Sequence, residues 1–213
     1  QMTEAWADAQ ARLHAVPVGP VMEELRAAGL SPEAVTFDGR LATLGQAIAD
    51  ANLDGLKPAL EWLQANRPPQ PATLSVCHGD LHPLNILASE GRVTAVLDWG
   101  NVALGDPALD VGSTIAGIAT TPFDVPAGLR PLVRSMLRYV LWRYRRAYRR
   151  RRAVDPAAVR YYQVFRSLNH LAGALRTAVQ GGAPAGAHHL PAARQLLVAH
   201  IRQLSGGAVS LVA

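Results

Sequence analysis

The chain has a single cysteine, Cys77, and a single lysine, Lys57, among its 213 residues. One cysteine excludes a disulfide framework within the chain and is typical of a reducing compartment. No apolar run approaches the roughly 18 residues that a membrane-spanning helix needs. The polar residues 1–10 lack the basic flank and the apolar stretch of a signal peptide. Since 49% of the residues are hydrophobic and 17% are charged, we expect a globular cytoplasmic domain without a membrane partner.

Acidic residues are scarce after residue 110, where Asp124 and Asp155 stand against 15 arginines, a balance of +13. Residues 1–110 hold 14 acidic and 6 basic residues, a balance of −8, and the two halves give the net charge of +5. A positive field over one half of the molecule disfavours a polycationic ligand there, because like charges repel.

The spacing of apolar residues predicts helices on both sides of a short central segment. Before residue 70 we expect helices at 5–16, 22–28, 41–53 and 56–65, with the Pro-Val-Gly-Pro segment at 17–20 ending the first. Asp106-Pro107 and Asp155-Pro156 each place an N-cap aspartate before a proline in the first helical turn. The later helices are expected from 107 onward and at 131–152, 156–180 and 190–204, with a linker at 181–186.

Three short aliphatic segments between these helices predict strands, at 74–77, 86–88 and 93–97. The polar residues 89–92 form a turn between the last two, so we expect a hairpin there. The predicted fold class is mostly α with a small β hairpin element, in one domain.

Three polar side chains, Asp80, Asn85 and Asp98, interrupt these strand-like segments. A carboxylate among apolar neighbours costs several kcal/mol unless it is paired or binds a cation. The hairpin would bring Asn85, before one strand, beside Asp98, after the other, and both present the oxygen atoms that suit Mg²⁺. Asp80 would lie one loop away, free to accept a proton.

The order of these residues resembles the aminoglycoside phosphotransferase and choline kinase-like family, a branch of the protein-kinase-like fold. The matching segments are H-G-D-x-x-x-x-N at 78–85, L-D-W at 97–99 and G-D-P-x-x-D at 105–110. Protein kinases carry comparable pieces in their catalytic loop and metal-binding motif. All three segments occur in order within about 35 residues, which is a specific pattern.

The resemblance implies an ATP-dependent phosphotransferase that uses Mg²⁺ and acts on a hydroxyl of a small molecule. Asp80 would be the base that accepts the proton of the acceptor hydroxyl. Asn85 and Asp98 would hold the Mg²⁺ that bridges the phosphates of ATP or another nucleoside triphosphate. His78 and Asp110 would be structural supports of the catalytic loop.

Other interpretations of the same residues remain open at the level of sequence. Asp80 could be a turn residue whose carboxylate is hydrogen-bonded within the protein. Alternatively, His78, Asp80 and His82 could form the metal triad of a hydrolase, although Gly79 and Pro83 break the strand that this triad needs. A non-catalytic module that binds a ligand or partner could use the same lobe. The intact Asp80, Asn85 and Asp98 favour the enzyme.

No residue before His78 fits the nucleotide-binding lobe of such a kinase. No G-x-G-x-x-G occurs, and Lys57 lies in a helical segment rather than in a strand. We therefore expect residues 1–213 to form a single C-terminal helical lobe that is inactive alone, with the N-terminal nucleotide lobe absent. The apolar face left by that lobe would allow a homodimer.

The arginines of the second half raise the question of what they bind. Those of the run 143–152 alternate with aromatic residues, which could indicate nucleic acid. Cations at a helix C-terminus also complement its dipole, and we favour this solvated helix end over nucleic-acid binding. We expect a neutral or anionic acceptor rather than a polycation. The arginines expected to face the acceptor are Arg130, Arg134, Arg138, Arg160 and Arg166.

Overall fold

The computed structural model describes residues 2–180 and 190–211. Most of them are helical, which confirms the predicted class. The helices are α1 (Met2–Leu13), α2 (Val18–Ala27), α3 (Phe37–Asp50), α4 (Lys57–Ala65), α5 (Pro107–Thr120), α6 (Arg130–Arg149), α7 (Pro156–Val179) and α8 (Leu190–Leu204). Each is too short or too polar to cross a lipid bilayer. The predicted linker at 181–186 lies outside the described residues.

The strands form two separate antiparallel pairs in the described part of the chain. β2 (Ile86–Ser89) pairs with β3 (Arg92–Val96), which confirms the predicted hairpin. β1 (Ser75–Cys77) pairs instead with β4 (Ala103–Gly105), a strand that the sequence analysis missed. The loop between β1 and β2 carries residues 78–85, so both pairs hold the segment where the candidate residues cluster.

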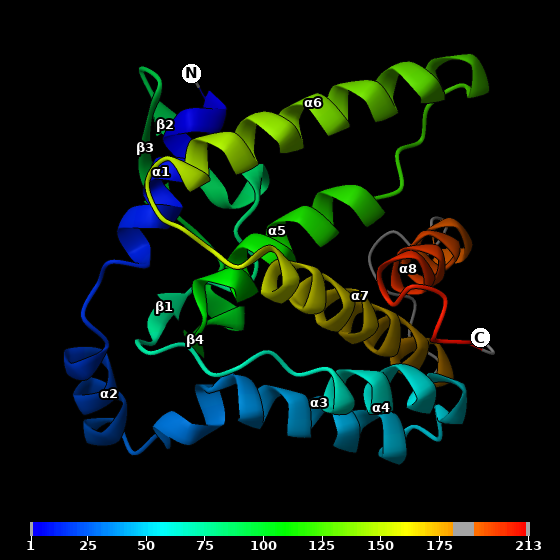
Figure 1. Cartoon of the computed structure of the whole chain (residues 1–213), viewed down its shortest axis with the longest axis horizontal. Helices are drawn as coiled ribbons and strands as arrows, with labels where there is room; N and C mark the ends of the chain where they lie inside the picture. Colours follow the sequence, from blue (N-terminus) through cyan, green and yellow to red (C-terminus); the bar gives the residue numbers. More distant parts are fainter. Residues whose placement is uncertain (1, 181–189, 212–213) are drawn as a thin grey trace.

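Helices α5 and α7 cross the middle of the molecule (Figure 1). Helix α6 runs along one side, packed on α1, and α3 and α4 run along the opposite side against α7. Helix α8 packs against α7. The central position of α5 matters because its first turns lie directly behind the loop that follows β1.

Helices α2 and α3 begin earlier than predicted. Val18, Gly19 and Pro20, expected to lie between helices, form the first turn of α2. The prediction was wrong because proline is tolerated in a first turn, where its missing N–H would have no helical partner. Similarly, α3 begins at Phe37, four residues early, where the Thr36 hydroxyl accepts a hydrogen bond from the Gly39 N–H.

The core between α3 and α7 is aromatic. Phe37 makes edge-to-face contacts with Tyr161, Tyr162 and Phe165, at centroid distances of 4.9–5.9 Å. Gly112 lets α5 approach α7 closely, because a Cβ there would lie 2.8 Å from the Tyr162 Cβ. This close packing fixes α5, and with it the side chains that α5 directs at the loop between β1 and β2.

Candidate active site

The loop that follows β1 turns sharply at Gly79. Its φ of +78° is one that residues with side chains rarely adopt, and a Cβ there would lie 2.0 Å from the Asn101 carbonyl oxygen. Only glycine fits this position without moving the backbone. Steric crowding therefore explains why the middle residue of the H-G-D segment is glycine.

Asp110 on α5 clamps the same turn from behind. Its carboxylate accepts hydrogen bonds from the His78 N–H at 2.8 Å and from the Gly79 N–H at 2.5 Å. His14 Nε2 donates to it at 2.9 Å, and the carboxylate is fully buried. Burial raises the pKa of Asp110, but the contact with His14 and the two backbone N–H groups outweigh it and hold that pKa below its ordinary value.

His78 joins the turn to the hairpin. Its ring is buried, Nε2 donates to the Leu97 carbonyl oxygen at 2.9 Å, and Nδ1 accepts from the Asp80 N–H at 3.2 Å. Both nitrogens are therefore used within the protein. The interpretation of His78, Asp80 and His82 as a metal triad is therefore wrong, because His78 has no lone pair left to bind a cation.

Asp80 presents its carboxylate at the surface of the loop. The side chain is 20% exposed, and Arg166 of α7 forms an ion pair with it from an almost fully buried position. His82 Nε2 lies 3.8 Å from the same carboxylate oxygen. Burial lowers the pKa of Arg166, while the negative charge of Asp80 opposes this effect. Among the arginines expected to face the acceptor, Arg166 lies at the site, whereas Arg160 donates to the Leu204 carbonyl.

Asn85 and Asp98 lie at the open end of the β2–β3 hairpin. The Leu97 N–H donates to the Asn85 carbonyl at 2.9 Å, which brings the two segments side by side. Asn85 Nδ2 donates to the Asp80 carbonyl at 3.0 Å, so its Oδ1 remains as an acceptor. Asp98 has a left-handed φ of +61° and is exposed, and its carboxylate makes no hydrogen bond or ion pair with any described residue.

The donor set at this end of the hairpin fits a hard divalent cation. Asn85 Oδ1 and the Asp98 carboxylate both offer oxygen atoms, which Mg²⁺ prefers over nitrogen or sulfur. These are the two residues that could hold the ion. The pairing of β2 with β3 brings the segments that carry these two side chains next to each other, as the sequence predicts.

A polar network lies behind the loop, and Asp110 is the one member of it that the sequence analysis named as a support. Three parts of the chain each contribute a pair of polar residues four positions apart: Gln10 of α1 with His14 just after that helix, Asp110 and Thr114 of α5, and Tyr144 and Tyr148 of α6. All six are buried. Polar residues at i and i+4 on otherwise apolar helix faces are the signal that could have revealed them.

This network supports the loop at residues 78–85 through Thr114 and through Asp110. The Thr114 hydroxyl donates to the Leu81 carbonyl at 2.7 Å, and Gln10 Nε2 lies 3.5 Å from Thr114 Oγ1. His14 Nδ1 lies 2.6 Å from the Tyr148 hydroxyl, while its Nε2 binds Asp110. The loop is thus held by α1, α5 and α6 together.

Cys77 is the remaining reactive side chain near the loop. Burial raises the pKa of its thiol well above the ordinary value, with the Asp110 and Asp106 charges adding to the effect. The thiol is fully buried. Cys77 is therefore a core residue and not a nucleophile.

Comparison with known families matches residues 1–154 to the model of the phosphotransferase enzyme family. A candidate aminoglycoside phosphotransferase of Ralstonia eutropha JMP134 superposes with a TM-score of 0.65 and 21% identity, covering 97% of this chain and 64% of that one. The macrolide 2′-phosphotransferase MphH of Brachybacterium faecium gives a TM-score of 0.52 and 24% identity, covering 92% of this chain and 60% of that one. These likenesses show the fold.

Two further matches extend the comparison. A thermostable mutant of the aminoglycoside phosphotransferase APH(4)-Ia, in a ternary complex with AMP-PNP and hygromycin B, gives a TM-score of 0.59 and 20% identity over 96% of this chain and 64% of that one. The uncharacterized protein YcbJ of Bacillus subtilis is 51% identical over 41 residues, which cover 19% of this chain and 13% of that protein. The chain thus spans less than two thirds of the length of these relatives.

Proposed function

Because the chain belongs to the phosphotransferase enzyme family, we propose that it carries out ATP-dependent transfer of a phosphoryl group to a hydroxyl of a small molecule. The observation that carries this proposal is the clamped loop. Asp110 fixes the backbone at His78 and Gly79, and this presents the Asp80 carboxylate next to the hairpin end that carries Asn85 and Asp98.

In the proposed reaction Asp80 is the general base. The acceptor oxygen attacks the γ-phosphorus, the new O–P bond forms as the bond to the β-phosphate oxygen breaks, and ADP leaves. The hydroxyl proton passes to the Asp80 carboxylate. Arg166 binds one oxygen of that carboxylate, which fixes its orientation.

Asn85 and Asp98 are proposed to hold Mg²⁺. When bound, such an ion neutralises the phosphate oxygens and orients the triphosphate. The Asp98 carboxylate and Asn85 Oδ1, which form no hydrogen bond with another described residue, support this assignment. His78 and Asp110 are proposed to act as supports, through the hydrogen bonds described above.

The charges beside Asp80 support a neutral or anionic acceptor. Arg166 pairs with the carboxylate and His82 lies 3.8 Å from it. Arg40 donates to the Asn101 carbonyl, next to the Gly79 turn, at 2.9 Å. The positive charges of Arg166 and Arg40 disfavour the approach of a polycationic acceptor, because like charges repel.

We further propose that residues 1–213 are the catalytic and acceptor-binding lobe, with the nucleotide enclosed by a second lobe outside them. The described residues before β1 form helices, and Lys57 begins α4, where it pairs with Asp54 at 2.7 Å. Exposed apolar side chains surround the proposed metal ligands: Leu84, Leu87, Leu97 and Trp99. Such a surface is typical of one that another segment or ligand covers.

The proposal is tested with the full-length protein that contains this chain. ATP consumption is measured with hygromycin B, erythromycin, a neutral sugar and a hydroxyacyl thioester as acceptors. Asp80→Asn should lower phosphoryl transfer by roughly 10²-fold or more, the scale of a lost general base. Asp54→Asn is the matched control, because Asp54 is exposed and pairs only with Lys57 among the described residues.

Equal turnover by Asp80→Asn and by the control would remove Asp80 from the mechanism. Faster turnover of hygromycin B than of the neutral and anionic acceptors would overturn the proposed acceptor class. If the wild-type protein consumes no ATP with any of these acceptors, the result would favour the non-catalytic module.

A further inference from the structure

The arginines near the end of α6 divide into two groups. Arg143 pairs with Glu4 at 3.2 Å and Arg151 pairs with Asp8 at 2.7 Å, both on α1. Arg152 donates to the His14 carbonyl at 2.8 Å and to the Ser75 hydroxyl at 3.1 Å. These three fasten α6 to the body of the protein, which gives each of them a structural role.

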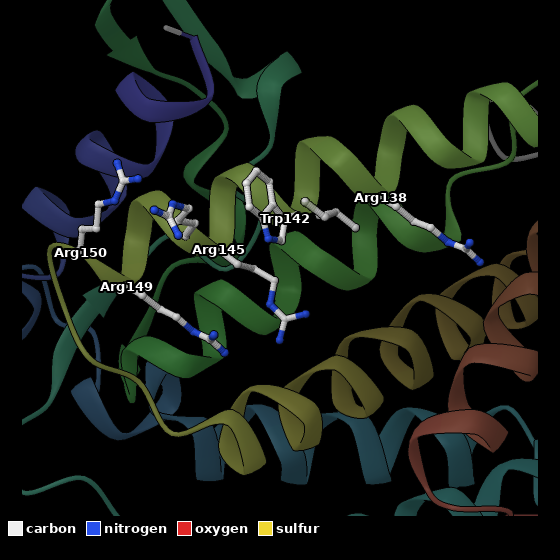
Figure 2. Close-up of a pocket in the computed structure, with 7 residues that line it drawn as sticks. Arg138, Trp142, Arg145, Arg149 and Arg150 are labelled. Atoms are coloured by element: carbon white, nitrogen blue, oxygen red, sulfur yellow. The ribbon is translucent and has the colours of Figure 1, made fainter.

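Five other arginines are not fastened in this way. Within residues 2–180 and 190–211, none of them forms an ion pair with an acidic side chain. Together with Leu141 and Trp142 they line one hollow of about 760 Å³, and they are Arg138, Arg145, Arg146, Arg149 and Arg150. Figure 2 shows Arg138, Arg145 and Arg149 leaving the same side of α6, as their spacing of seven and four residues requires. The volume lies in the range of small-molecule sites.

Trp142 is the only aromatic side chain in this lining. It is 56% exposed, so more than half of its surface is free for a ligand. Tyr139 stacks on it at a centroid distance of 5.9 Å, and the Arg146 guanidinium lies 5.9 Å from its ring centre. Tyr144 and Tyr148, which the sequence suggested as further stacking partners, are fully buried.

The ratio of cations to rings decides which anion fits. A single-stranded nucleic acid has one phosphate for each base, so its groove needs several stacking rings beside its cations. Here Arg138, Arg145 and Arg149 accompany one indole on the same side of α6, and Tyr139, which stacks on that indole, is not part of the lining. A nucleoside polyphosphate has several phosphate charges and one base, which matches this lining. Arginine also suits phosphate, because its planar donors bind two oxygens at once.

We propose that the hollow lined by Arg138, Trp142, Arg145 and Arg149 binds a nucleoside polyphosphate, with the phosphates on the arginines and the base on Trp142. All seven lining residues belong to α6 or immediately follow it, and none is Asp80, Asn85 or Asp98. The site is therefore separate from the proposed active site. It goes beyond the proposed function and does not depend on it.

Calorimetric titration of the purified 213-residue chain tests this proposal, with ATP as the probe and EDTA present to remove divalent ions. The double substitution Arg145→Gln and Arg149→Gln should weaken ATP binding about tenfold or more, since it removes charge-assisted hydrogen bonds to the phosphates. Arg26→Gln with Arg92→Gln is the matched control. It also removes two exposed arginines, but both lie outside the hollow.

The base contact is tested separately with Trp142→Leu. This change should weaken the binding of ATP but leave that of inorganic triphosphate unaltered. Equal effects on both probes, or none on either, would overturn the assignment of the base to Trp142. Circular dichroism and thermal melting of each variant verify that the fold is retained.

Three results would overturn the site as a whole. Equal ATP affinity in the hollow variant and in its control would place the nucleotide elsewhere. Loss of ATP binding in Asp98→Asn would place it at the active site. Tighter binding of oligothymidylate, or of phosphatidylglycerol vesicles, than of ATP would show that the arginines serve a strand or a lipid surface instead.

Discussion

Helix α6 has two faces of opposite character. Tyr144 and Tyr148 face inward and are fully buried, and the Tyr148 hydroxyl contacts His14 in the polar network that supports the loop at residues 78–85. Arg145 and Arg149, each one position further along, are exposed, and among the described residues neither meets an acid. One helix thus contributes both to the packed support of the proposed active site and to an exposed cationic surface.

The two faces differ because exposed polar groups can form hydrogen bonds with water and buried ones cannot. A buried polar atom has no solvent to replace a lost partner, so the fold depends on every contact of Asp110 and His14. An exposed guanidinium keeps its hydration whichever way it turns, so the fold gains little from it. The inner face should therefore control stability, and the outer face should control binding.

The largest expected effect is at Asp110. Asp110→Ala leaves the His78 N–H, the Gly79 N–H and His14 without their acceptor, and we expect a loss of about 3–5 kcal/mol in the free energy of unfolding. Asp106→Ala, at the N-cap of the same helix, should cost only about 1 kcal/mol. Urea unfolding of both variants measures the difference. Equal losses would show that the clamp is no more than a helix cap.

Arg166 lies between the two extremes, because it is buried but its partner Asp80 is 20% exposed. Arg166→Met keeps the length of the side chain and removes the charge, so water can still reach Asp80. We expect kcat/KM to fall about tenfold, or 1.4 kcal/mol, with the acceptor that the panel identifies. Arg160→Met, on the exposed side of α7, is the control. An unchanged rate would mean that Arg166 does not orient the base.

The contrast also explains what the sequence could predict. The helices, the hairpin and the H-G-D segment depend on neighbours within a few residues, so local patterns reveal them. Asp106 as a helix cap was predicted for the same reason and is confirmed by its bond to the Ala108 N–H. The roles of Asp80, Asn85 and Asp98 stay predictions, with the geometry described above in their support.

The missed features depend on distant parts of the chain. His14 meets Asp110 across 96 positions, and Arg166 meets Asp80 across 86. Strand β4 has only three residues, Ala103 to Gly105, and pairs with β1, so it is too short for a periodic sequence pattern to predict it. Exposure of individual side chains on α6 was equally hidden, since arginines and aromatic residues alternate along its sequence while only some face water.

A smaller effect concerns the titration of Asp110. Its pKa is below the ordinary 3.8, with burial opposed by His14 and the backbone donors. The folded state therefore binds this proton less readily than the unfolded state, so the contribution is complete above pH 3.8 and is lost as the pH falls through the folded pKa. Acid titration of unfolding should show a steeper loss below pH 3.8 in the wild type than in Asp110→Asn. Parallel curves would contradict the lowered pKa.

The smallest expected effect is on the outer face of α6. Arg145→Gln with Arg149→Gln should change the free energy of unfolding by no more than about 0.5 kcal/mol, because neither side chain has a partner to lose among the described residues. Arg152→Gln, only three positions beyond Arg149, should cost about 1–2 kcal/mol, since its guanidinium donates to the His14 carbonyl and to Ser75. Urea unfolding compares the two variants directly. A double variant as unstable as Arg152→Gln would show that the arginines of the hollow also support the fold, and the two faces of α6 would then no longer differ in kind.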